Sequence, residues 1–133
     1  MELEGFNTEK GSNMADFNQV TLMGRLGKDA EIRTLPGGGN VASFSVATDT
    51  GYKDKQSGEW KKNTHWHQIV TFQEGIIKML ESRGKKGTRV LLQGQLEHRN
   101  WRKDGETSDR TQAEIKIGPQ DSFTFLDADK AEK

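Results

Sequence analysis

The order of strand-like and helix-like segments is the feature that most limits the fold of this chain. Three segments with apolar side chains at alternate positions come first, at residues 18–26, 41–50 and 64–72. Such alternation is typical of strands with one buried face. Residues 73–83 then have helical spacing, and Gly84 follows as a terminator. Two more alternating segments, 87–100 and 112–117, complete an order of three strands, one helix and two strands.

This order predicts an all-β protein with the OB-fold, a five-stranded Greek-key barrel with one helix between strands three and four. The connections agree with this prediction because they are polar and contain glycine. Residues 36–40 read as a turn, and residues 51–63 and 103–110 as long hairpin loops. Barrels of this kind bind oligonucleotides across strands two and three and the adjoining loops.

Composition limits the chain to one small domain. It has 133 residues, of which 31% are apolar, and its mean hydropathy is −0.89. The absence of cysteine excludes a disulfide framework and a thiolate metal site. We expect residues 1–16 to be a flexible leader or expression remnant, residues 17–126 to be the folded domain, and residues 127–133 to be a short disordered tail.

Charge is unevenly distributed, although the formal net charge is zero. Residues 1–13 and residues 121–133 each carry a net charge of −2, whereas residues 78–103 carry +6. A local basic face matters more for binding an anionic partner than the total charge does.

Aromatic side chains within basic, strand-like segments point to the function. A tryptophan beside cations is a poor core residue but a good stacking platform, and single-stranded nucleic acid offers a π-face on every base and a charge on every phosphate. The candidate stacking residues are Tyr52, Trp60, Trp66, Phe72 and Trp101. The candidate phosphate-binding residues are Lys53, Lys55, Lys61, Lys62, Arg99, Arg102 and Lys103.

The two-residue period of a strand places Trp66 and Phe72 on one face of residues 64–72. The alternative is that this row of aromatic side chains is buried in the core, because one face of a barrel strand must be buried. The polar Gln68 on the same face favours an exposed Trp66. Trp101 is favoured still more strongly as an open platform, since it lies at a strand end between cations.

Catalytic interpretations are weak. His65, His67 and His98 are candidate metal ligands, yet no carboxylate stands at a matching spacing. We therefore expect no enzyme activity, catalytic residue, metal or cofactor. A metal-dependent nuclease would require bound metal and degradation of the strand.

Four blocks of sequence closely resemble the bacterial single-stranded DNA-binding protein (SSB) family: NQVTLMGRLGKDAEIR, GGGNVASFSVAT, THWHQIVTF and GQLEHRNW. They stand in the order and spacing of that family and cover about residues 17 to 119. The resemblance implies an OB-fold, a homotetramer, and wrapping of single-stranded DNA during replication, recombination and repair.

The resemblance also assigns roles to individual residues. It implies that Tyr52, Trp66, Phe72 and Trp101 are the stacking aromatics, with a tyrosine where the family has a tryptophan. It implies that His67 lies at the oligomer interface. Trp60 has no fixed counterpart and is a candidate for an extra contact.

The C-terminus departs from the family. Its bacterial members end in an acidic peptide tipped with phenylalanine that recruits repair and replication proteins, whereas this chain ends in LDADKAEK. The resemblance therefore leaves tail-mediated recruitment in doubt, and we do not count it among the expected partners. We expect a cytoplasmic, nucleoid-associated protein of bacterial, phage or plasmid origin, with an organelle form left open.

Two binding alternatives also stay open. One is an OB-fold protein-interaction module of the primosome type, which would not need so many exposed tryptophans. The other is a cold-shock-type RNA binder, which would be shorter and would have its aromatics on adjacent strands. A preference for DNA over RNA cannot be assigned, because no residue can be matched to a 2′-hydroxyl.

Overall fold

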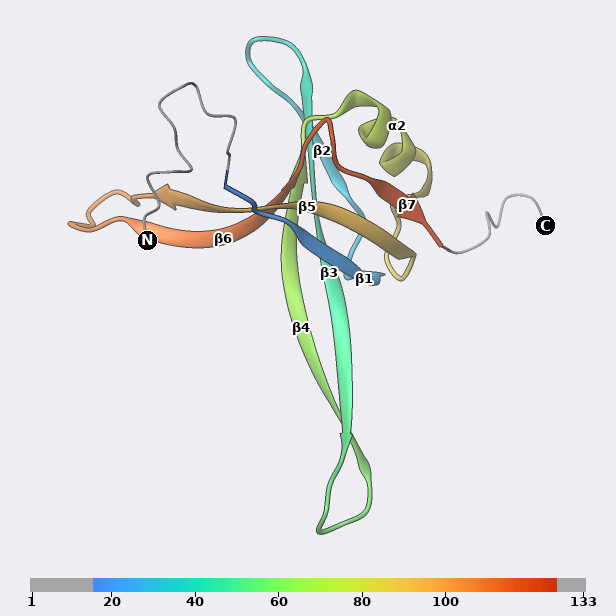
Figure 1. Ribbon diagram of the computed structural model, residues 1–133. Helices are drawn as coiled ribbons and strands as arrows, with labels where there is room; N and C mark the ends of the chain where they lie inside the picture. Colours follow the sequence, from blue (N-terminus) through green and yellow to red (C-terminus); the bar gives the residue numbers. More distant parts are fainter. Residues whose placement is uncertain (1–15, 127–133) are drawn as a thin grey trace, which may run out of the picture.

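Five strands close into a barrel in the computed structural model, which describes residues 16–126 (Figure 1). The elements in chain order are β1 (Val20–Leu26), β2 (Glu31–Thr34), β3 (Asn40–Lys53), β4 (Trp60–Thr71), α2 (Glu74–Arg83), β5 (Arg89–Trp101), β6 (Arg110–Ile117) and β7 (Phe123–Phe125). The ladder runs β1–β3–β4–β6–β5, and β5 pairs back onto β1. The predicted OB-fold is confirmed, with α2 between the third and fourth barrel strands. The short strand β2 pairs antiparallel with β3, and the short strand β7 pairs antiparallel with β5.

Alternation along the strands produces the core. Phe44 on β3 and Ile69 on β4 are directly opposite each other and both are buried. The ring of Phe44 meets Phe123 edge to face, with the ring centroids 5.8 Å apart. Thr71 is the buried polar residue of this interior, and its hydroxyl donates to the Ile117 carbonyl at 2.9 Å. A buried hydroxyl with such an acceptor avoids most of the cost of losing water.

The barrel closes where β1 passes from one neighbour to the other. β1 pairs with β5 from Val20 to Arg25, but with β3 only at Arg25 and Leu26. A side chain at Gly24 would collide with the Ala47 carbonyl of β3. Glycine at this position therefore allows the two backbones to approach closely enough to close the ring.

Helix α2 lies at one end of the barrel (Figure 1). It buries Ile77 and Leu80 in the core, and its other side chains are mostly exposed. Within residues 16–126 no helix is long and apolar enough to span a membrane.

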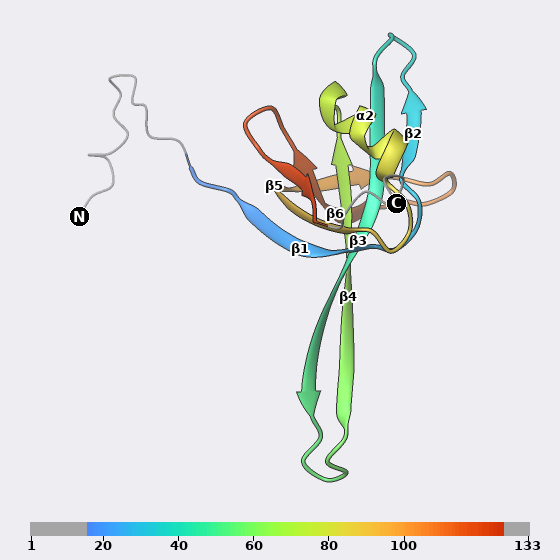
Figure 2. The same ribbon diagram turned by 90° about the vertical axis from the view of Figure 1, so that its right-hand side faces the viewer.

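The predicted loop at residues 51–63 is wrong in extent. β3 continues to Lys53 and β4 starts at Trp60, so that Tyr52 pairs with Lys61 and the connecting loop covers residues 54–59 alone. We call residues 49–64 the β3–β4 arm; it projects far from the barrel in both views (Figures 1 and 2). Outside the barrel neither face of this ribbon packs on a core, so most of its side chains are polar and do not alternate with apolar ones.

A second arm is formed by β5 and β6 beyond the barrel. We call residues 97–114 the β5–β6 arm, and it leaves the barrel in a different direction from the first (Figure 1). The predicted loop at residues 103–110 corresponds closely to its tip, which connects Trp101 to Arg110.

The expected leader and tail lie almost wholly outside the described residues, since residues 1–15 and 127–133 are not part of the description.

Candidate nucleic-acid interface

The outer face of β4 carries a row of exposed aromatic side chains. Trp66 is 63% exposed and Phe72 is 43% exposed, whereas Ile69 and Thr71 on the opposite face are buried. The predicted division of the strand into two faces is confirmed. Trp66 is a surface residue rather than part of the core.

Gly27 positions the indole of Trp66. A side chain at residue 27 would collide with the six-membered ring of Trp66, so that ring lies against the Gly27 backbone. The ring is thereby supported on one side while most of its surface stays accessible. A ring held in this way loses little freedom when a base stacks on it, which favours binding.

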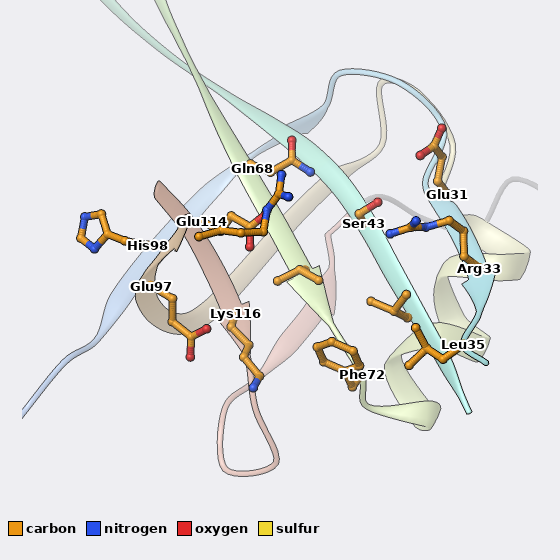
Figure 3. A pocket seen from close by; sticks show the side chains of 13 residues that line it. Glu31, Arg33, Leu35, Ser43, Gln68, Phe72, Glu97, His98, Glu114 and Lys116 are labelled. Atoms are coloured by element: carbon orange, nitrogen blue, oxygen red, sulfur yellow. The ribbon is translucent and has the colours of Figure 1, made fainter. Parts of the chain in front are cut away.

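Phe72 lies in a groove of about 760 Å³ across the outer face of the sheet (Figure 3). β2, β3, β4, β5 and β6 all contribute to its lining. The ammonium nitrogen of Lys116 is 5.4 Å from the centroid of the Phe72 ring, and Figure 3 shows the two side chains beside each other. Arg33 on β2 also lines this groove.

Lys116 and Arg33 were missed by the sequence reasoning. The signal for Lys116 was present, because it stands between the inward-facing Ile115 and Ile117 and must therefore point outward. Arg33 follows Ile32, which packs against the core, so its outward direction was also indicated; its place beside the groove depends on the pairing of β2 with β3.

Trp101 is less open than Trp66, so the expectation that it is the more exposed of the two is wrong. It is half-buried at the end of β5. The guanidinium carbon of Arg99 lies 4.7 Å from the centroid of its ring. The two residues share one face of the strand, and the neighbouring cation covers the ring instead of flanking it.

Tyr52 and Trp60 lie on the β3–β4 arm but on opposite faces of it. Trp60 shares the face of Trp66, because six residues separate them, whereas Tyr52 pairs with Lys61 on the other face. Trp60 is 73% exposed, and its ring lies against the backbone of Gly51. The structure therefore places Tyr52 apart from the aromatic row of β4.

The cations of the two arms differ in their partners. On the β3–β4 arm, Lys53, Lys55 and Lys61 make no ion pair with any residue that the structure describes. Lys62 has one long contact, 3.8 Å from Asp49.

The arginines of the β5–β6 arm are all paired with carboxylates. The pairs are Arg99 with Glu114 at 3.0 Å, Arg102 with Asp109 at 3.0 Å and Arg110 with Glu106. The hydrogen bond from Arg110 lowers the pKa of Glu106, so that this pair remains charged well below neutral pH. Lys103 at the tip has no ion pair among the described residues.

His67 lies on the face of β4 opposite to Trp66. Its Nε2 shares a hydrogen bond with the Thr48 hydroxyl at 2.9 Å. Burial, and to a smaller extent the charge of His65, lowers the pKa of His67. The histidines do not assemble a metal site: among residues 16–126 no three His, Asp or Glu side chains are grouped to hold an ion.

Comparisons with known proteins agree with this geometry. Residues 17–124 match the model of the single-strand binding protein family. The chain is 38% identical over 111 residues to a single-stranded DNA-binding protein of Rhizobium meliloti (strain 1021), an alignment that covers 83% of this chain and 63% of that relative. The chain thus spans less than two thirds of the length of that relative.

A solved structure is similar over nearly its whole length. It is described as a Plasmodium falciparum SSB complex with ssDNA, and it superposes with a TM-score of 0.74 at 34% identity. The match covers 86% of this chain and 99% of that one.

Proposed function

Because this chain belongs to the single-strand binding protein family, we propose that it binds and protects single-stranded DNA through base stacking and phosphate contacts. The family consists of binding proteins rather than enzymes. In this proposal the protein covers exposed single strands during replication, recombination and repair.

The aromatic row of β4 is the observation that carries the proposal. Trp60, Trp66 and Phe72 share one face and are six residues apart, which corresponds to about 20 Å between neighbours along an extended strand. Each base stacked on such a ring contributes roughly 1–3 kcal/mol. Stacking accepts any base, so weak sequence preference follows. Trp101 and Tyr52 extend the stacking surface onto β5 and the opposite face of the β3–β4 arm.

Lysines of the β3–β4 arm supply phosphate contacts in this proposal. Lys53, Lys55 and Lys61 can take a phosphate without breaking an ion pair among the described residues. Each phosphate neutralised makes the plot of log K against log salt concentration steeper by about 0.7 for a single strand.

We also propose that four copies assemble and share one wrapped strand. Met23 on β1 and Leu91 on β5 are directly opposite in register, and both are exposed on the outer face of the barrel. Such apolar side chains are suited to burial against another copy. His67 is the candidate interface residue on the face opposite to Trp66.

A tryptophan-fluorescence titration tests the proposal directly. The protein is titrated with oligo-dT and with a duplex of equal length, at low and high salt, and oligo-U is added to compare RNA. Strong quenching by the single strand alone, weakened by salt, is the expected result, and the stoichiometry reports how many chains share one strand. Absence of quenching would favour the protein-interaction alternative.

Replacing both Trp66 and Trp101 with alanine tests the stacking surface. We expect affinity for oligo-dT to fall by several kcal/mol per assembled tetramer, measured by anisotropy of a labelled strand. Met79→Ala on α2 removes an exposed apolar side chain outside the groove and should leave affinity unchanged. Unchanged affinity in the folded double variant would reject the aromatic surface.

A further inference from the structure

Arg99 is held by three contacts before any ligand is bound. Its Nε donates to Glu114 Oε2 at 3.0 Å, and its Nη2 donates to Gln112 Oε1 at 3.4 Å. Its guanidinium carbon lies 4.7 Å from the centroid of the Trp101 ring. These contacts come from both strands of the β5–β6 arm.

This arrangement weakens the site at Trp101 in two ways. The guanidinium covers a face of the indole that a base would otherwise use for stacking. The carboxylate of Glu114 also compensates the charge of Arg99, so a phosphate approaching the guanidinium meets a neighbouring negative charge. Among the described residues no cation lies over the ring of Trp66, and that residue is 63% exposed.

Glu114 is well placed to act as this restraint because it is largely buried. Its side chain is 16% exposed, compared with 53% for that of Arg99. The more accessible partner is therefore the cation, so a phosphate can reach Arg99 while Glu114 stays in place. Glu97 is directly opposite Glu114 on β5 and lines the same groove, but it makes no ion pair with any residue from 16 to 126.

On the basis of the proposed function, we propose that Glu114 is a positioning residue that restrains single-stranded DNA binding at Trp101. It holds Arg99 over the indole, and an incoming strand binds fully there only when a phosphate replaces the carboxylate as the partner of the guanidinium. Transfer of the guanidinium uncovers the ring for a base. The β5–β6 arm thus binds phosphate by exchanging a carboxylate partner for it, whereas the lysines of the β3–β4 arm that have no ion pair among the described residues bind phosphate directly.

Glu114→Gln tests the proposal because it keeps the shape and an acceptor oxygen but removes the charge. With a dT oligomer of about ten nucleotides, within the site size of one OB-fold, we expect binding about two- to fivefold tighter than wild type. We also expect the salt dependence to become steeper by about 0.7, because the phosphate that Arg99 neutralises releases its counterion and residue 114, now neutral, takes up no cation when Arg99 leaves it.

Two further variants separate this effect from a general loss of negative charge. Glu97→Gln removes the same charge from the same groove and should leave the salt dependence unchanged. Arg99→Gln should cost little affinity in wild type, where Arg99 is already occupied, and more in the Glu114→Gln protein. A double-mutant cycle over Arg99 and Glu114 measures this coupling.

Equal effects of Glu114→Gln in the presence and absence of Arg99 would overturn the proposal, and so would weaker binding by the Glu114→Gln variant. Circular dichroism of each variant establishes that it is folded. Failure of the proposed function is a distinct result, because wild type itself would then not bind oligo-dT.

Discussion

The absence of a side chain at Gly27 leaves room for the indole of Trp66 and so determines where that ring lies. The indole of Trp66 occupies the space that any Cβ at residue 27 would need. Nothing in the neighbourhood of Gly27 along the chain indicates this contact, because the two residues lie far apart in sequence and meet only through the fold.

We expect Gly27→Ala to displace the Trp66 ring and to weaken binding of oligo-dT without unfolding the protein. The atoms in the way are side-chain atoms, two at the far end of the indole and the Ser45 Oγ, so movement of side chains resolves the conflict. Binding by anisotropy is the measurement, repeated in the Trp66→Ala background. An equal loss in that background would show that Gly27 acts independently of Trp66.

His67 gives the stability a pH dependence. Burial lowers the pKa of His67 in the folded protein below the ordinary value of 6.5. As the pH falls, the unfolded chain therefore binds a proton on this histidine before the folded chain does. The contribution of His67 is fully present above pH 6.5 and is lost as the pH falls toward the lower folded pKa.

We therefore expect urea unfolding to show that wild type loses more stability than His67→Gln between about pH 7.5 and 5.5, the range around the ordinary histidine pKa. The comparison of the two proteins removes the effect of carboxylates, which titrate in both. A parallel loss in the two proteins would contradict this assignment.

At the scale of elements, the two arms differ in whether their cations are paired with carboxylates. On the β3–β4 arm, Lys53, Lys55 and Lys61 have no ion pair among the described residues and Lys62 has one long contact, whereas each arginine of the β5–β6 arm is paired with a carboxylate. Exposed ion pairs are weak, at roughly 0.2–1 kcal/mol, but they decide whether a cation can offer its charge to a phosphate without an exchange.

We expect Lys53→Gln with Lys61→Gln to weaken binding and to make the salt dependence shallower by up to about 0.7 per lysine. Arg102→Gln should change the salt dependence less, because Asp109 already compensates its charge. Affinities across a salt series provide the measurement. Lys78→Gln on α2 is the control, and a change as large as that of the arm lysines would refute the assignment to this arm.

At the scale of the molecule, one small core supports both arms. Phe44 is almost fully buried and its ring meets Phe123, so the barrel and the edge strand β7 share one packed interior. The arms themselves contribute little burial, and their order depends on strand pairing that starts in the barrel.

We expect Phe44→Ala to lower the free energy of unfolding by about 3–5 kcal/mol, a large part of the roughly 5–15 kcal/mol of an ordinary domain. Phe44→Leu should cost much less because it leaves a smaller cavity. Urea unfolding followed by circular dichroism measures both. A small loss for Phe44→Ala would mean that the barrel core can collapse around the missing ring.

Much of the barrel and of the aromatic face was predictable from local pattern. Strand residues alternate with a period of two, so the two-residue period alone assigns the buried Ile69 and the exposed Trp66 to opposite faces of one strand. The segment order likewise predicted the OB-fold and the place of α2. These properties depend on neighbours along the chain.

Contacts between strands could not be predicted in this way, because they depend on register and on the closing of the barrel. The pairing of β5 with β6 brings Glu114 to Arg99 across 15 residues and leaves Trp101 partly covered. The pairing of β3 with β4 beyond the core turns a predicted loop into an arm. Pattern thus assigned each side chain to a face, whereas tertiary pairing determined which charges and rings on that face meet.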